Sequence, residues 1–223
     1  MDVKETIDEI FKDWIDQVKD DGGFMSYIAA NGGYEKEVQN FLAFQLQKKR
    51  ESSSELILME RTITNGSKDS PRKKVDILAV DPSIKDFKEG EAFFLDSDKN
   101  RVKINYGIEL KHRMYKDSII SNTELPIQDW NKCFKAGLRR LYTVSIITDC
   151  KSCRSTYDEV QVKYRKKISC DESNQKREIR LKKIDDNFKN LDSNCRRIVV
   201  EYPEFQNAKF YSHIYICDHS PGV

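Results

Sequence analysis

The sequence predicts an α/β protein with one mixed β-sheet flanked by helices, and two kinds of pattern support this class. In some segments apolar residues recur at helical spacing, while others are short runs rich in β-branched and aromatic residues. Helical and extended segments follow one another along the chain, as in folds whose helices cover a sheet. Helices are predicted at residues 3–19, 34–48, after Pro126 and at 178–191, and strands at 56–64, 74–80, 91–95, 101–109, 141–147, 197–202 and 210–217.

The core of the predicted fold lies at about residues 34–149, in the order helix, strand, strand, strand, helix, strand (α-β-β-β-α-β). Segments 91–95 and 101–109 flank a turn-rich stretch and are expected to pair as a hairpin. Residues 141–147 form a continuous apolar run, which is typical of a strand buried on both faces. Residues 112–125 have weak periodicity and are expected to form a loop.

A single domain spanning residues 1–223 is the simplest organisation, because the chain contains no recognisable repeat, low-complexity tract or linker. The amphipathic helix at 3–19 is expected to cover one face of the core. Residues 150–223 are expected to form a basic α/β extension packed on the core, with its two strands lengthening the sheet at an edge.

The charges are unevenly placed along the chain, although the net charge is only +2. Residues 1–37 hold ten acidic and four basic side chains, whereas residues 151–183 hold eleven basic and five acidic ones. This asymmetry suggests that one surface meets a polyanion. The segment that includes Lys163, Arg165, Lys166 and Lys167 interleaves bases with a tyrosine and is the predicted nucleic-acid-binding surface; a solvated basic helix is the alternative.

The chain shows no apolar run long enough to cross a bilayer, and its acidic amphipathic start differs from a signal peptide, so we expect a cytoplasmic protein without a membrane partner. Its six cysteines are therefore expected to be reduced thiols. Cys150 and Cys153 form a C-x-x-C pair, but no second such pair or well-spaced histidine pair accompanies it. The pattern does not predict a zinc site.

Charged residues inside the predicted strands form the candidate active site. Asp76 interrupts an apolar strand, where a carboxylate is costly to bury unless it is paired or binds a metal. Glu109 and Lys111 project from one face of the strand at 101–109 and its continuation, because side chains alternate along an extended chain. Two carboxylates and an ammonium fit a hard divalent cation, for which Mg²⁺ is the natural candidate, and phosphodiester hydrolysis as the reaction.

These residues, in this order, resemble the PD-(D/E)XK nuclease superfamily, which has the restriction-endonuclease-like fold. The resemblance covers residues 34–149: Asp76 matches the aspartate of the second strand, and Glu109-Leu-Lys111 matches the E-x-K motif. It implies that Asp76, Glu109 and the Leu110 backbone carbonyl bind Mg²⁺, which Mn²⁺ can replace, and that Lys111 activates water. Val75 stands where the motif has proline.

The family also has a glutamate on the helix that precedes the strands. Here Glu37 is preferred for that role, as a residue between Tyr34, Val38 and Phe41 on the predicted inward stripe, and Glu35 is the rival. The resemblance implies a magnesium-dependent endonuclease that acts on DNA, in a setting such as restriction, phage defence or mobile-element biology, with a homodimer as a common state. The alternatives are a non-cleaving nucleic-acid-binding protein on the same fold and a nuclease directed at RNA.

Structural explanations of the same residues remain open at this stage. Glu109 and Lys111 could form an ion pair on a solvated sheet face, and Asp76 could pair with Arg72 or Lys73. Three further residues are candidates for a supporting role near the site or for a purely structural one: Glu60 inside a strand, and Gln128 and Asp129 at the start of a helix.

Overall fold

The computed structural model describes residues 2–20, 34–50, 55–83, 88, 90–95, 101–114, 125–150, 174–204 and 210–219. At residues 34, 101, 113–114, 125–129, 149–150 and 174–177 it describes the backbone alone. The statements below concern these parts of the chain.

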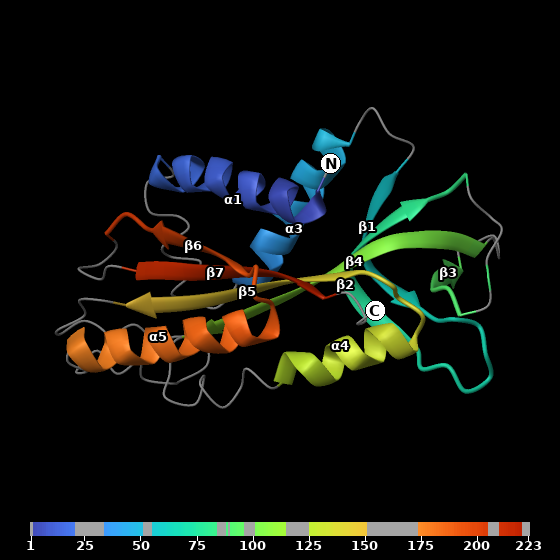
Figure 1. The fold of residues 1–223 in the computed structure, drawn as a ribbon. Coiled ribbons are helices and arrows are strands. Elements are labelled where there is room, and N and C mark those ends of the chain that lie inside the picture. The colour runs from blue at the N-terminus through green and yellow to red at the C-terminus, as the bar shows by residue number, and fades with distance from the viewer. Residues whose placement is uncertain are drawn as a thin grey trace, which may run out of the picture. The chain divides into compact units, whose positions relative to one another are not determined.

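The structure is an α/β fold with a mixed seven-stranded open sheet flanked by helices, which confirms the predicted class (Figure 1). The strand order is β1-β2-β4-β5-β7-β6, and β3 pairs with β4 outside this path. The predicted order of helices and strands is also confirmed. The elements are α1 (Val3–Lys19), α3 (Tyr34–Lys49), β1 (Leu56–Ile63), β2 (Lys73–Asp81), β3 (Phe93–Leu95), β4 (Arg101–Met114), α4 (Leu125–Lys135), β5 (Leu141–Cys150), α5 (Asn174–Leu191), β6 (Arg196–Glu201) and β7 (Phe210–His219).

The chain divides into two compact units, each assembled from segments that are distant in sequence. Unit 1 comprises Met1–Val38, Lys111–Thr123 and Val144–Cys217, and unit 2 comprises Gln39–Leu110, Glu124–Thr143 and Asp218–Val223. Because α3, β4, β5 and β7 each run through a boundary, they contribute residues to both units. The predicted single domain stays a prediction.

In unit 2, antiparallel pairing joins β1 to β2 and β2 to β4. The printed register of the second pair runs from Ile77 opposite Ile108 to Asp81 opposite Lys103, with a register shift at Ala79 and Val80. The predicted hairpin is confirmed, because β3 pairs antiparallel with the first residues of β4. This pairing places Asp76 just beyond the last paired residue of β2, next to Glu109 and Leu110 of β4.

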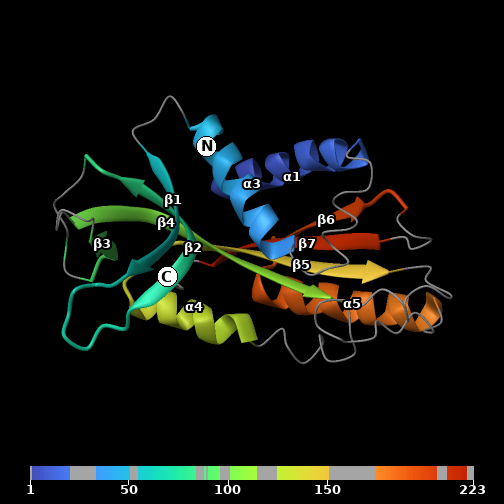
Figure 2. The same cartoon turned by 180° about the vertical axis from the view of Figure 1, so that it is seen from behind.

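In unit 1, β6 and β7 pair antiparallel, from Arg196 opposite Ile216 to Glu201 opposite Tyr211. Helices α1 and α5 lie on opposite faces of these strands, as both views show (Figures 1 and 2). Ile184 and Phe188 of α5 pack against Tyr215 and Cys217 of β7. As predicted, the C-terminal strands lengthen the sheet at an edge, with β6 outermost.

Helix α1 forms where an amphipathic pattern follows a good N-cap. The Asp2 carboxylate accepts a hydrogen bond from the Lys4 backbone N–H (3.0 Å), which satisfies one of the free amides of the first turn. The apolar residues Ile7, Phe11 and Trp14 recur one turn apart and are buried. None of the helices in the described ranges is long and apolar enough to cross a membrane.

Several element boundaries differ from the prediction, most clearly the ends of β4, α4 and β5 and the start of α5. Strand β4 continues to Met114, so residues 112–114, which were expected in a loop, belong to this strand. Helix α4 ends at Lys135, and Leu138, predicted on its face, lies beyond it in the buried turn. The reason is Gly137, which has φ +94° and thus leaves the helical conformation; the Gly137 carbonyl accepts from the Ala92 N–H (2.9 Å).

Candidate active site

Asp76 is held against β4 by its side chain. One carboxylate oxygen of Asp76 accepts a hydrogen bond of 2.7 Å from the Leu110 backbone N–H, and both residues belong to unit 2. The backbone pairing of β2 with β4 ends at Ile77 and Ile108, one residue away from Asp76. The Asp76 carboxylate therefore extends the contact between the two strands beyond their backbone pairing. The sequence indicated a charged residue inside an apolar strand, and the structure explains it by a bond to the strand that carries Glu109.

The Leu110 carbonyl lies at the same edge of β4 as the Leu110 N–H. In an antiparallel strand, a residue directs its N–H and its C=O to the same neighbour. Since the Leu110 N–H points to Asp76, its carbonyl oxygen also faces the β2 side. The geometry is therefore compatible with the predicted role of that carbonyl as an oxygen ligand beside Asp76.

Glu109 is buried in unit 2, with 4% of its surface exposed, and it forms an ion pair with Lys73. The Lys73 ammonium lies 3.4 Å from one carboxylate oxygen of Glu109, and the lysine side chain is itself only 18% exposed. A buried carboxylate is costly unless a positive charge or a metal compensates it. Lys73 at the start of β2 supplies such a charge, and its proximity was proposed from the sequence for Asp76 instead.

The donor set of the predicted metal site consists of the carboxylates of Asp76 and Glu109 and the carbonyl of Leu110. In the described part of the chain, no group of three or more His, Cys, Asp or Glu side chains is arranged to hold a metal ion. Two carboxylates and a carbonyl are nevertheless all oxygen donors, the chemistry that Mg²⁺ takes while it keeps several waters. As oxygen donors these groups fit a hard divalent cation, which would have to compete with the Lys73 ammonium for Glu109.

Lys111 and Glu35 form an ion pair within unit 1. The Lys111 ammonium lies 3.9 Å from one oxygen of Glu35, and both side chains are partly exposed. The other Glu35 oxygen accepts a hydrogen bond of 2.9 Å from the His112 backbone N–H. The backbone bond orients the Glu35 carboxylate, which in turn sets a negative charge beside Lys111. Glu109 therefore has an ion pair with Lys73 in unit 2, and Lys111 has one with Glu35 in unit 1. The pair proposed between Glu109 and Lys111 themselves stays a prediction.

The preference for Glu37 over Glu35 as the inward-facing helix carboxylate is wrong, because Glu37 is exposed. The buried stripe of α3 is formed by Val38, Leu42 and Leu46. At about 100° per residue, Glu35 falls in the middle of this stripe, whereas Glu37 lies about 160° from Glu35 around the helix. The prediction placed the stripe on the side of Tyr34 and Phe41, and this choice put Glu37 rather than Glu35 on the buried side. Which of the two glutamates has a role in the site stays a prediction.

Gln39 is a site residue that the sequence reasoning missed. It lies on the buried side of α3, is 3% exposed, and donates a hydrogen bond of 2.8 Å to the backbone carbonyl of Asp76. This bond ties α3 to β2 at the residue that carries the carboxylate. The available signal was a polar residue one turn after Glu35, among apolar residues, where a buried amide must find a partner.

His112 begins a chain of buried hydrogen bonds across unit 1. Its Nε2 lies 2.9 Å from the Thr148 hydroxyl, which lies 2.8 Å from the Ser212 hydroxyl, and the Tyr202 hydroxyl donates to Ser212 at 3.0 Å. These residues connect β4, β5 and β7 immediately after Lys111. Because buried polar groups must be satisfied, the network favours one register of the three strands.

The remaining predicted residues have the following positions. Glu60 lies on edge strand β1 and forms an ion pair with Lys74, which favours its reading as an edge residue. The side chains of Gln128, Asp129 and Cys150 lie outside the described part of the structure. So do the predicted nucleic-acid-binding residues Lys163, Arg165, Lys166 and Lys167, together with Cys153.

A scan of the sequence against protein-family models, a search of curated proteins and a search of solved structures each gave no match.

Proposed function

We propose that the chain is a divalent-metal-dependent nuclease of the restriction-endonuclease-like class, which hydrolyses phosphodiester bonds of DNA. The observation that carries the proposal is the hydrogen bond from Leu110 to the Asp76 carboxylate. This bond holds an acidic side chain beside Leu110, the middle residue of the motif Glu109-Leu110-Lys111. It supports a catalytic role for the E-x-K motif, which is too short to indicate a function by itself. The mixed sheet and the order of its elements agree with this class.

In the proposed site, Asp76, Glu109 and the Leu110 carbonyl hold Mg²⁺, for which Mn²⁺ can substitute. The bound ion would supply a water of lowered pKa and polarise a phosphodiester oxygen. Lys111 follows Glu109 by two residues on the same strand, and its ammonium would orient the water and offset negative charge that develops on the phosphate. Glu35, oriented by the His112 N–H, would restrict the positions that the Lys111 side chain takes.

The test is cleavage of supercoiled, linear and single-stranded DNA with and without Mg²⁺. The Asp76→Asn variant is the most informative one, because the amide oxygen can still accept from Leu110 while the charge is lost. We expect it, Glu109→Gln and Lys111→Ala each to reduce cleavage by about a hundredfold or more. Asp81→Asn is the matched control at the other end of β2, and it should cleave like the parent protein. Undiminished cleavage by the Asp76 and Lys111 variants would refute the site.

A second candidate function, a nucleic-acid-binding protein that does not cleave, is favoured by one contact. The Lys73 ammonium already offsets the charge of Glu109, as expected if this carboxylate is structural. In that case DNA or RNA should bind without Mg²⁺, and no metal should bind at Asp76 and Glu109. Calorimetric titration with Mg²⁺ distinguishes this function from the metal-dependent nuclease. Binding and cleavage assays run in parallel with DNA and RNA distinguish a DNA nuclease from one that acts on RNA.

A further inference from the structure

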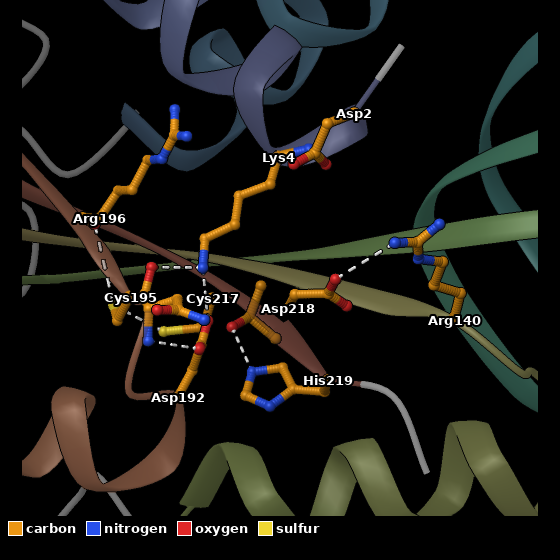
Figure 3. Close-up of polar contacts among 11 residues, drawn as sticks. Asp2, Lys4, Arg140, Asp192, Cys195, Arg196, Cys217, Asp218 and His219 are labelled. Atoms are coloured by element: carbon orange, nitrogen blue, oxygen red, sulfur yellow. Dashed lines mark hydrogen bonds and ion pairs between the residues drawn. The ribbon is translucent and has the colours of Figure 1, made fainter. Parts of the chain in front are cut away.

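Two cysteines of unit 1 face each other across the edge of the sheet (Figure 3). Cys195 immediately precedes β6, and Cys217 lies in β7. The antiparallel register places Arg196 opposite Ile216, so Cys195 and Cys217 occupy the next positions outward. Directly opposed residues of an antiparallel pair have Cα atoms about 4.5 to 5.5 Å apart. This separation falls within the range of about 4.4 to 6.8 Å that a disulfide requires.

The side chains also point toward each other. The two sulfur atoms are 2.8 Å apart, and the Cys217 thiol donates to the Cys195 sulfur. Both are free thiols in the structure. Only a small further approach separates this contact from a covalent bond between the sulfurs, whose length is about 2.05 Å.

The two thiols differ in access. Cys195 is partly exposed, whereas Cys217 is fully buried beneath α5 with Ile184 and Phe188. The hydrogen bond to Cys195 and burial raise the pKa of the Cys217 thiol, which therefore keeps its proton. A dissolved oxidant can thus reach Cys195 first. Cys217 then lies close enough to react with the oxidised Cys195 sulfur.

The backbone around Cys195 is held in place. The Cys195 N–H donates to the Asp192 carbonyl at 2.8 Å, and the Asp192 carboxylate forms a buried ion pair of 2.6 Å with Lys4 of α1 (Figure 3). A second contact joins Asp8 of α1 to Arg196, the first residue of β6, at 3.1 Å. These bonds keep the Cys195 side chain opposite Cys217, so formation of a disulfide requires little rearrangement of the chain.

We propose that Cys195 and Cys217 are an oxidation site that forms a reversible intramolecular disulfide when the folded protein meets hydrogen peroxide. The Cys195 thiolate attacks one peroxide oxygen, the O–O bond breaks, and with one proton the products are a Cys195 sulfenic acid and water. The Cys217 sulfur then attacks the sulfenic sulfur; its proton and the hydroxyl leave as a second water, and the S–S bond forms. Both thiols are oxidised by one electron each, and peroxide takes up the two electrons.

The experiment treats the whole folded chain with graded hydrogen peroxide, blocks the remaining thiols by alkylation, and maps tryptic peptides by mass spectrometry without reduction. The proposal expects peptides 190–196 and 210–223 joined, lighter by two hydrogens than their sum, and separated again by dithiothreitol. It also expects the Cys217→Ser variant to accumulate a sulfenic acid at Cys195 that dimedone traps. Formation of the joined peptides should be faster in the folded protein than in urea.

Cys133 provides the matched control, because it is a buried, reduced cysteine of unit 2. A Cys133→Ser variant should form the joined peptides as fast as the parent. The proposal is overturned if Cys195 oxidises to sulfinic acid while Cys217 remains a free thiol, if Cys195 links mainly to another cysteine, or if unfolding leaves the rate of linkage unchanged.

Discussion

At the scale of single residues, the candidate site is defined by which cation accompanies which carboxylate. Glu109 has Lys73 beside it, and Glu35 has Lys111. The contact at Glu109 bears on the two functions proposed above, because a metal at Glu109 would have to compete with the Lys73 ammonium. Because of this competition, we expect the effect of replacing Lys73 on the free energy of unfolding to differ with and without Mg²⁺.

Replacing Lys73 by methionine tests the competition. Without metal, Lys73→Met leaves Glu109 buried with one of its ion-pair partners removed, and we expect the free energy of unfolding to fall by about 3 kcal/mol. Mg²⁺ should restore part of this loss and should bind the variant more tightly than the parent. Urea unfolding with and without Mg²⁺ measures both effects.

Lys74→Met is the control for this pair of measurements. Lys74 is the neighbouring lysine on β2, and its ion pair with Glu60 lies on the exposed edge of the sheet. Its loss should change the free energy of unfolding by at most about 1 kcal/mol, with no dependence on Mg²⁺. If Mg²⁺ stabilises Lys73→Met no more than it stabilises the Lys74→Met control, Glu109 is not a metal ligand.

The two glutamates of α3 give a second prediction at this scale. In Glu35→Gln the side-chain oxygen can still accept from His112, but the charge beside Lys111 is gone. If Lys111 acts in cleavage, we expect this variant to cleave about tenfold or more slowly while its stability changes little. Glu37→Gln is exposed and should cleave like the parent. Equal rates for the two variants would remove Glu35 from the site.

At the scale of elements, Glu91 links the hairpin to the turn after α4. Its carboxylate lies 3.5 Å from both the Lys103 ammonium and the Arg139 guanidinium, and accepts from the Lys88 N–H at 3.3 Å. Burial, the largest single effect, would raise the pKa of Glu91. The Lys88 N–H and the two cations together outweigh it, so the pKa is lowered.

This lowered pKa predicts how stability depends on pH. A carboxyl whose pKa is lower in the folded state contributes stability above its unfolded pKa, about 4.3 for glutamate. The contribution is lost as the pH falls through the folded value, because the unfolded chain then binds the proton more readily. Urea unfolding of the parent and of Glu91→Gln between pH 7 and pH 3 should give curves that converge toward acid. Parallel curves would contradict the assignment.

The extent of individual elements shows where sequence patterns are informative. Two strands were predicted, one with Asp76 and one with Glu109 and Lys111. A run of apolar residues rich in β-branched side chains indicates a strand from the local sequence alone. The buried face of α3 was not predicted correctly. The helix is only weakly amphipathic, and because Phe44 is exposed, its apolar residues suggest two possible buried stripes. Only the strands against which the helix packs determine which stripe is buried.

At the scale of the whole molecule, the distribution of charge gives the remaining prediction. Neutralising Arg165, Lys166 and Lys167 together should weaken DNA binding, and should make the slope of log affinity against log salt shallower by about 2 to 3. The measurement is fluorescence anisotropy at several salt concentrations. A control that neutralises the exposed lysines Lys12, Lys19 and Lys48 should leave the slope unchanged. Equal slopes for the two triple variants would exclude the basic segment from binding.

The sequence by itself determined the class of fold, the order of helices and strands, and the three charged residues Asp76, Glu109 and Lys111 on their strands. These features depend on short-range periodicity, which a single chain displays directly. The tertiary structure decided which group each charge meets. Lys73 is 36 residues from Glu109, and Glu35 is 77 from His112. Periodicity tells which face a side chain occupies, but the partner on that face is set by segments that meet only when the chain folds.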